Sequence, residues 1–240
     1  MKAVILLAGI GSRLHPLTLD RPKSLLPMGG STTLHHMISK LQRHGITSFI
    51  IICGHMQEMI EAYIHQAFPA LDVCFIRNEH YLDTNTGYSL MLARPALAGE
   101  GFVKLDGDVM FDEVILQRLM AYPPTASVVC VDHTAVNDEV IKVICHPDGT
   151  IARIGNRLAV DQAIGESIGI ETISAEVAPV LFDRLEQMMQ SKDSWKNYYE
   201  VAYDDIIQTG ARFLPLDITG LKWVEMDTHE DYQQALRDFG

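Results

Sequence analysis

The chain has 240 residues, 48% of them hydrophobic, which is enough apolar material for one substantial core. Its net charge of −12, from 31 acidic and 19 basic residues, argues against nonspecific binding to nucleic acid or to anionic membranes. No run reaches the ~18 apolar residues of a membrane span, and the apolar N-terminus is too short for a secretion signal, so we expect a cytoplasmic protein.

The first predicted element is an apolar strand over 3–7, which leads into a turn that contains Gly9 and Gly11 and is followed by Arg13 and Lys23. Glycine lets backbone N–H groups approach phosphate oxygens, while arginine offers a fork of donors and lysine a compact charge. The pattern indicates a loop that binds a nucleoside triphosphate, and an ordinary strand-to-helix turn is the structural alternative.

Two better-known glycine loops do not match this turn. A P-loop has a glycine directly before its lysine, whereas Lys23 follows Pro22. The dinucleotide fingerprint has a third glycine at the position that Leu14 occupies here.

The run Leu6–Arg13, with Pro16–Thr18 and Pro22–Pro27 behind it, resembles the N-terminal signature of a nucleotidyltransferase family. That family includes sugar-1-phosphate nucleotidylyltransferases and the phosphocholine and inositol-1-phosphate cytidylyltransferases. The visible departure in the first part is Leu7, where the family usually has alanine, and we expect it to change packing rather than chemistry.

The resemblance implies roles for the residues of this loop. Arg13 would meet the β and γ phosphates and Lys23 would bridge the nucleotide and acceptor phosphates, so that both act in catalysis and Lys23 also binds the acceptor. The implied nucleotide contacts in the loop are Leu6, Ala8, Gly9, Gly11, Ser12 and Arg13.

Strands and helices alternate after the loop, which predicts an open α/β sheet with helices on both sides. Met56 and Met59 are expected in the core. The predicted elements of this part are helix 33–44, strand 49–53, helix 56–64, strand 71–76, helix 87–94 and strand 102–106.

The run Asn85-Thr86-Gly87 resembles the base-pocket segment of the cytidylyltransferase branch. The amide of Asn85 and the hydroxyl of Thr86 offer donors and acceptors for cytosine, which favours CTP. A helix cap made by Asn85 or Thr86 is the structural alternative, and it is compatible with base binding.

Asp106 and Asp108 follow the predicted strand 102–106, with a glycine between them. Such oxygen ligands beside substrate phosphates suit Mg²⁺, although Asp-Gly also forms ordinary turns. The resemblance assigns Asp108 as the principal metal ligand and leaves Asp106 a supporting role beside the nucleotide. Lys104 and Lys142 are either extra phosphate contacts or, as we expect, surface lysines.

The later half of the chain continues with strands and helices, and the turn at 146–149 predicts a hairpin. Thr228 and Asp231 predict a capped final helix. The other predicted elements are strands 127–131, 140–145, 151–154, 167–173, 213–216 and 222–226, and helices 177–188 and 201–208.

Asp227 lies where the resembling family has an aspartate at the end of its last strand, so it is expected to join Asp108 as a metal ligand. An acid at a helix N-terminus is the alternative interpretation.

For the acceptor, Glu171 stands where phosphocholine enzymes of the family carry aromatic residues, which makes choline a less favoured acceptor. Glu171 is expected to bind acceptor hydroxyls or an amine. One aromatic and acidic cluster has two possible roles: it packs in the core or in an interface, or it lines the acceptor site. Its residues are Trp195, Tyr198, Tyr199 and Glu200.

Four cysteines stand in apolar runs without a C-x-x-C pair, and ten histidines lack metal-binding spacing. We expect buried thiols, no disulfide scaffold and no zinc site. The cysteines are Cys53, Cys74, Cys130 and Cys145.

The resemblance implies a three-layer α/β/α Rossmann-like nucleotidyltransferase fold with a mostly parallel mixed sheet and a small hairpin insertion. We expect one domain over 1–240, with a nucleotide-binding part at about 1–111 and an acceptor-binding part at about 112–240.

The expected function is Mg²⁺-dependent transfer of CMP from CTP to a small phosphorylated or phosphonate acceptor, which is a sugar, inositol or amino-alcohol phosphate. Two alternatives stay open: a sugar-1-phosphate nucleotidylyltransferase that uses UTP, dTTP or GTP, and a nucleotide-binding regulatory module without turnover. The acceptor and the oligomeric state, a homodimer included, are not decided by the sequence.

Overall fold

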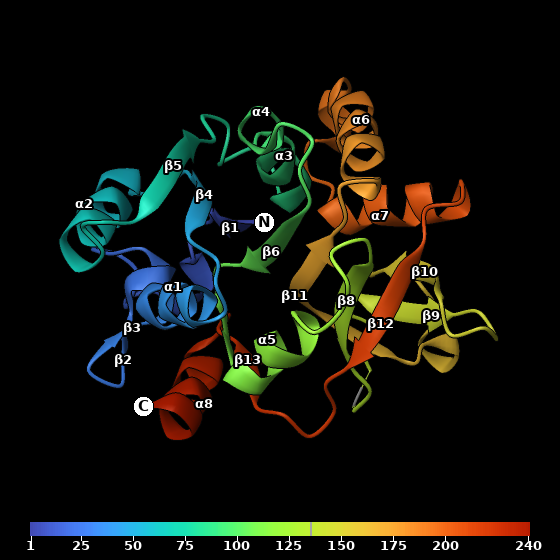
Figure 1. Ribbon diagram of the computed structural model, residues 1–240. Helices are drawn as coiled ribbons and strands as arrows, with labels where there is room; N and C mark the ends of the chain where they lie inside the picture. The colour runs from blue at the N-terminus through green and yellow to red at the C-terminus, as the bar shows by residue number, and fades with distance from the viewer. Residues whose placement is uncertain (135) are drawn as a thin grey trace.

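The computed structural model describes residues 1–134 and 136–240, and its centre is a nine-stranded sheet (Figure 1). The strands of this sheet are β1 (Lys2–Leu7), β4 (Ser48–Cys53), β5 (Asp72–Arg77), β6 (Phe102–Asp106), β8 (Ser127–Asp132), β9 (Lys142–Cys145), β10 (Ile151–Gly155), β11 (Gly165–Ile173) and β12 (Phe213–Asp217). Two short two-stranded sheets accompany it, formed by β2 (Pro27–Met28) with β3 (Ser31–Thr32) and by β7 (Val109–Phe111) with β13 (Trp223–Glu225).

The sheet is mixed, with a parallel half. Its main path is β10-β9-β11-β6-β1-β4-β5, while β8 pairs with β11 and β12 pairs with β8. The strands β6, β1, β4 and β5 are parallel neighbours, and only β10 and β11 run against the direction of the other seven. Strands β9 and β10 form the predicted hairpin.

Alternating side chains of the central strands feed two hydrophobic cores, one on each face of the sheet. In β1, Ile5 and Leu7 belong to one core and Val4 and Leu6 to the other, as the two-residue period of a strand requires. Because β1 is buried on both faces, its sequence is a continuous apolar run. The predicted three-layer arrangement is therefore confirmed.

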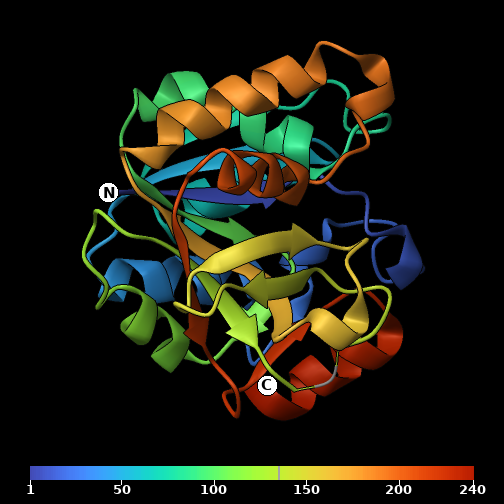
Figure 2. The same ribbon diagram turned by 90° about the vertical axis from the view of Figure 1, so that its right-hand side faces the viewer.

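Helices cover both faces, as the two views show (Figures 1 and 2). Helices α1 (Thr33–Arg43), α2 (Gln57–Ala67) and α5 (Glu113–Leu119) pack against one core. Helices α3 (Thr86–Met91), α4 (Arg94–Leu97), α6 (Val177–Met189) and α7 (Tyr199–Gln208) pack against the other. None of the helices in these described ranges is long and apolar enough to cross a bilayer.

A third, smaller core fixes helix α8 (His229–Phe239) beside the loop that follows β1. Tyr232 of α8 packs there with Leu14, Leu26 and Met226, and its hydroxyl donates a 2.7 Å hydrogen bond to the carbonyl of Pro27. The last part of the chain is thereby held against the first.

Several expectations need correction. The predicted helix over 87–94 is two short helices, α3 and α4. The regular helix is interrupted just before Pro95, which lies in the first turn of α4. The pattern did not predict α5, whose seven residues are too few to display a full apolar period. Met59 is 41% exposed rather than in the core, and Cys74 is exposed rather than buried.

Candidate active site

The turn after β1 has a backbone that only glycine adopts easily. Gly11 has φ +69°, and its carbonyl accepts a 2.8 Å hydrogen bond from the Thr18 hydroxyl. A Cβ on Gly11 would stand 3.2 Å from the Cβ of Lys23, so this glycine also lets the lysine segment approach the turn. At Gly9 no atom lies within 4 Å of an added Cβ, which leaves the backbone open to a ligand.

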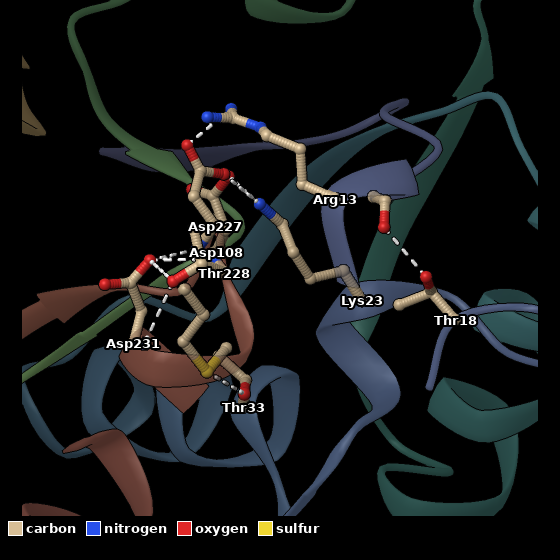
Figure 3. A network of polar contacts seen from close by, with 10 residues as sticks. Arg13, Thr18, Lys23, Thr33, Asp108, Asp227, Thr228 and Asp231 are labelled. Atoms are coloured by element: carbon tan, nitrogen blue, oxygen red, sulfur yellow. Dashed lines mark hydrogen bonds and ion pairs between the residues drawn. The ribbon is translucent and has the colours of Figure 1, made fainter. Parts of the chain in front are cut away.

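The two cations of the loop meet carboxylates from distant parts of the chain (Figure 3). Lys23 Nζ lies 2.7 Å from Asp108 Oδ2 and 2.9 Å from Asp227 Oδ1, and Arg13 Nη2 lies 2.6 Å from Asp227 Oδ2. Burial alone would lower the pKa of Lys23, but these two carboxylates raise it above its usual value. Lys23 is therefore positively charged at neutral pH.

A tight turn at the end of β6 presents Asp106 and Asp108. Gly107 lies in this turn, and its N–H donates a 3.1 Å hydrogen bond to the carbonyl of Leu6. An added Cβ at Gly107 would overlap the side chain of Leu7, so the close approach of β6 and β1 requires glycine. The parallel pairing of the two strands places the aspartates beside the loop after β1, at the carboxyl edge of the sheet.

Asp227 does not serve as the cap of the last helix. Thr228 and Asp231 form the capping box of α8, and Asp231 Oδ2 also accepts a 3.1 Å hydrogen bond from the Asp227 N–H. The backbone N–H of Met226 donates to the Asp108 carbonyl at 3.0 Å, which fixes the two segments side by side. The Asp227 carboxylate consequently faces Asp108 and the cations (Figure 3).

Three carboxylates could hold a divalent cation here. Asp108, Glu225 and Asp227 each offer an oxygen, and these atoms lie within 4.8 Å of one another. Asp108 Oδ1 is buried and has no hydrogen-bond partner among the described residues, which leaves it available as a ligand. Hard oxygen donors of this kind fit Mg²⁺. The residues present therefore suit the predicted metal.

Glu225 was not predicted from the sequence. A signal was present, because Glu225 and Asp227 are two residues apart at the end of β13, where alternate side chains face the same way. Desolvation in the acidic cluster, with the neighbouring carboxylates of Asp108 and Asp227, raises the pKa of Glu225 to about 8.

The predicted base-pocket run divides between two roles. Asn85 precedes α3, and its side-chain oxygen accepts a 2.8 Å hydrogen bond from the Thr86 N–H. The Thr86 hydroxyl oxygen has no partner among the described residues. Gly87 instead packs against the backbone of Asn197, and its N–H donates a 3.3 Å hydrogen bond to the Asn197 carbonyl. Because glycine has no side chain, the two backbones can approach this closely.

A single cavity of about 1130 Å³ joins these groups, and it is larger than a typical site for one small molecule. It therefore has room for a nucleotide and an acceptor together. The predicted site residues that line it are Leu6, Ala8, Gly9, Gly11, Ser12, Arg13, Lys23, Asn85, Thr86, Asp106, Asp108 and Asp227.

A buried polar cluster lies behind one wall of this cavity. Lys104 is fully buried, with its Nζ 3.0 Å from Asp106 Oδ2 and 3.1 Å from Glu171 Oε1. The Tyr199 hydroxyl donates to Asp106 at 2.8 Å, and the Tyr203 hydroxyl donates to Glu171 at 2.9 Å. Desolvation would lower the pKa of Lys104, but the surrounding carboxylates raise it, so Lys104 stays charged.

These positions correct three expectations. Glu171 is 1% exposed and does not line the cavity. Its Oε1 is already bound by Lys104 and Tyr203, so its surroundings do not favour a direct contact with the acceptor. Lys104 is not a surface lysine, and neither is Lys142, which is buried and donates to the carbonyl of Asn156 at 2.7 Å.

Residues 3–180 match the family model described as "MobA-like NTP transferase domain". Over 241 aligned residues the chain is 27% identical to CMP-5'-(3-aminopropyl)phosphonate synthase of Streptomyces rubellomurinus. This alignment covers 98% of this chain and 38% of that protein. It is also 27% identical to the bifunctional IPC transferase and DIPP synthase of Aquifex aeolicus, over 97% of this chain and 50% of that protein. The chain thus spans half or less of the length of these curated relatives.

Among solved structures, the chain is similar to the CTP:phosphocholine cytidylyltransferase of Streptococcus pneumoniae, with a TM-score of 0.80 and 24% identity. The similarity covers 99% of this chain and 98% of that one. It supports the predicted fold.

Proposed function

This chain belongs to the family of MobA-like NTP transferase domains, and from that premise we propose that it transfers CMP from CTP to a small acceptor that carries a phosphate or phosphonate group. The observation that carries the proposal is the convergence of Arg13, Lys23, Asp108 and Asp227 in one cavity. These residues come from three distant segments of the chain. A regulatory module without turnover would have no need for the complete set.

The nucleotide is proposed to lie along the turn after β1. The backbone at Gly9 is open to the cavity. Among the described residues that line the cavity, the only arginine is Arg13 and the only lysine is Lys23. A triphosphate needs local cations in a chain of net charge −12. When it binds, both cations would exchange their carboxylate partners for phosphate oxygens.

Asp108 and Asp227, assisted by Glu225, are proposed to hold Mg²⁺ beside the phosphates. The ion supplies Lewis-acid polarisation of the phosphoryl oxygens and neutralises charge in the transition state. Asp106 remains bound to Lys104 and Tyr199 and so serves to shape the wall next to these ligands.

The acceptor oxygen would attack the α-phosphorus in line with the leaving pyrophosphate. A new bond forms between that oxygen and the α-phosphorus, and the bond from the α-phosphorus to the α,β-bridging oxygen breaks, with its electrons leaving on pyrophosphate. A phosphate monoester loses its second proton at a pKa of about 6, so the nucleophile is already ionised and needs no general base. Lys23, which pairs with Asp108 in the cavity, is proposed to contact both reacting groups and to stabilise the charge that develops between them.

The preference for CTP rests on Asn85 and Thr86. Both line the cavity, and the Thr86 hydroxyl oxygen is unpaired within the described structure and so available to a base. The Streptomyces relative is named for a product that contains CMP, which supports the same nucleotide here. The alternative is a sugar-1-phosphate nucleotidylyltransferase that uses UTP, dTTP or GTP.

A pyrophosphate-release assay tests the function. Each of CTP, UTP, dTTP and GTP is combined with Mg²⁺ and with phosphoethanolamine, inositol 1-phosphate or glucose 1-phosphate. We expect release with CTP to exceed release with the other nucleotides at least tenfold. Preference for another nucleotide would favour the alternative enzyme, and no release from any pair would favour the regulatory module.

A further inference from the structure

The indole of Trp223 makes a hydrogen bond that the proposed reaction does not use. Its Nε1 donates at 2.6 Å to Asp132 Oδ2, although the two residues are 91 positions apart in the sequence. Asp132 is 7% exposed at the end of β8, and its Oδ1 accepts a 3.0 Å hydrogen bond from the Thr134 N–H. An indole has a single donor, so the contact satisfies Trp223 and gives each oxygen of a buried carboxyl group a partner.

Strand β13, which carries Trp223, lies apart from the main sheet. It pairs with β7 in a two-stranded sheet, and the residues that flank β13 are hydrogen-bonded through their backbones to the residues that flank β7. The bond to Asp132 adds a connection to β8, a strand of the main sheet. Because Glu225 lies on β13 and Asp227 two residues beyond its end, this connection bears on the position of the proposed metal ligands.

Asp132 also lies beside a second wall of the cavity. In the antiparallel pairing of β8 with β11 its partner is Glu166, which lines the cavity together with Ser167 and Ile168. An added Cβ at Gly165 would overlap the Asp132 carbonyl, so β11 approaches β8 closely at this residue. The nucleotide is proposed to lie along the turn after β1 and the start of α3, which leaves the β11 wall to the acceptor.

We propose that Trp223 and Asp132 are positioning residues, whose hydrogen bond fixes the metal ligands at β13 relative to the acceptor wall at β11. The inference rests on the proposed function and adds two residues to its site. In-line attack requires the acceptor and the nucleotide phosphates to be held in alignment, and a misplacement of about 1 Å can lower the rate about 100-fold. The hydrogen bond acts through the strands that it joins, so neither residue has to touch the reacting atoms.

The burial of Asp132 explains why the bond resists movement of β13. A displacement of β13 would break the hydrogen bond and leave a carboxyl oxygen without this partner in a site removed from water, which costs free energy. Packing of the Trp223 ring against the core does not supply this direction, because phenylalanine could fill most of the same space.

A double-mutant cycle tests the proposal. Trp223→Phe keeps an aromatic ring and loses the N–H, whereas Asp132→Leu loses the acceptor oxygen. With Mg²⁺ and the nucleotide and acceptor pair of the pyrophosphate assay that reacts fastest, we expect each change to lower kcat at least tenfold and to change the KM for the nucleotide less than threefold. The double variant should lose no more than either single variant, because both remove the same hydrogen bond, and losses that multiply would overturn the proposal.

Trp195→Phe is the matched control for a general loss of structure. The Trp195 indole donates a 2.9 Å hydrogen bond to the carbonyl of Met189, but Trp195 is not among the residues that line the cavity. The control therefore loses the same kind of bond, and its kcat should stay within threefold of the unmodified chain. An equal loss of kcat in Trp195→Phe and Trp223→Phe would refute a positioning role.

Tryptophan fluorescence gives a readout that does not depend on turnover. The chain has two tryptophans, so Trp195→Phe leaves Trp223 as the single emitter. In that chain we expect Mg²⁺ to change the Trp223 emission, and Asp132→Leu to raise the half-saturating Mg²⁺ concentration at least fivefold. An unchanged half-saturation point, or no response to Mg²⁺, would overturn the proposal.

These measurements separate the proposal from the proposed function. If no nucleotide is turned over, the proposed function fails and the Mg²⁺ titration still decides on the positioning pair. Turnover with a kcat that Trp223→Phe leaves unchanged refutes the pair and keeps the function. If Asp132→Leu does not fold, Trp223→Phe decides, through its kcat or through calorimetric titration with Mg²⁺.

Discussion

Lys23 Nζ lies 2.7 Å from Asp108 Oδ2, although the two residues are 85 positions apart in the sequence. The cation expected to meet substrate phosphates is thus paired with the carboxylate expected to hold the metal. In the proposed complex a triphosphate with Mg²⁺ would match both groups at once, because phosphate would replace the carboxylate beside lysine and the metal would replace lysine beside the carboxylate. The ion pairs keep the charges in place until the substrate arrives.

Lys23→Met is expected to lower kcat/KM for CTP at least 100-fold, because the variant loses a charge that stabilises the transition state. Lys222→Met is the control, since the Lys222 side chain is 60% exposed, pairs with Asp238 and is not among the residues that line the cavity. Pyrophosphate release measures both. Equal losses in the two variants would show that the phosphate site has been misplaced.

Asp108→Asn and Asp227→Asn are each expected to raise the Mg²⁺ concentration needed for half-maximal activity and to lower the maximal rate at least 100-fold. Removal of divalent ions with EDTA should abolish activity in the unmodified chain, and Mg²⁺ should restore it. Asp20→Asn changes an exposed carboxylate and should leave the Mg²⁺ titration unchanged. A normal Mg²⁺ titration for Asp108→Asn would refute its role as a ligand.

Much of the fold follows from local patterns. The apolar run of β1 and the glycines after it predict a buried strand and a phosphate loop, because both signals lie within a dozen residues. Asp108 and Asp227 stand out for the same reason, since Asp108 lies two residues after β6 and Asp227 directly precedes the N-cap of α8. The proposed division at about residue 111 remains a prediction.

The buried cluster could not be predicted in this way. Lys104 and Glu171 are direct cross-strand partners in β6 and β11, but the sequence separates them by more than sixty residues. Only the sheet order places β11 beside β6. A lysine in an apolar strand therefore looked like a surface residue, and a strand-end glutamate looked like a ligand of the acceptor.

Lys104→Met is expected to destabilise the chain by about 3 to 5 kcal/mol, because it leaves the buried carboxyl group of Glu171 and the half-buried one of Asp106 without their cation. Urea unfolding measures the effect, and the exposed Lys222→Met serves as the reference. A change below about 1 kcal/mol would mean that these carboxyl groups do not depend on the lysine charge.

Gly169→Ala is expected to remove activity as well as stability. Gly169 has φ +73° at an irregularity of β11, and an added Cβ would overlap the Asp106 carboxylate. Gly149→Ala is matched to it, because Gly149 has φ +83° with open space around it, so only a backbone cost of about 1 to 2 kcal/mol is expected there. Equal kcat/KM values for the two variants would argue against the importance of the Asp106 position.

The most direct test of the proposed nucleotide and metal site is a crystal structure of the chain with Mg²⁺ and a CTP analogue whose α,β bridge cannot be cleaved. We expect the triphosphate along residues 8–13, Lys23 moved onto a phosphate oxygen, and the metal about 2.1 Å from oxygens of Asp108 and Asp227. A nucleotide bound elsewhere, with the Lys23–Asp108 ion pair intact, would contradict it.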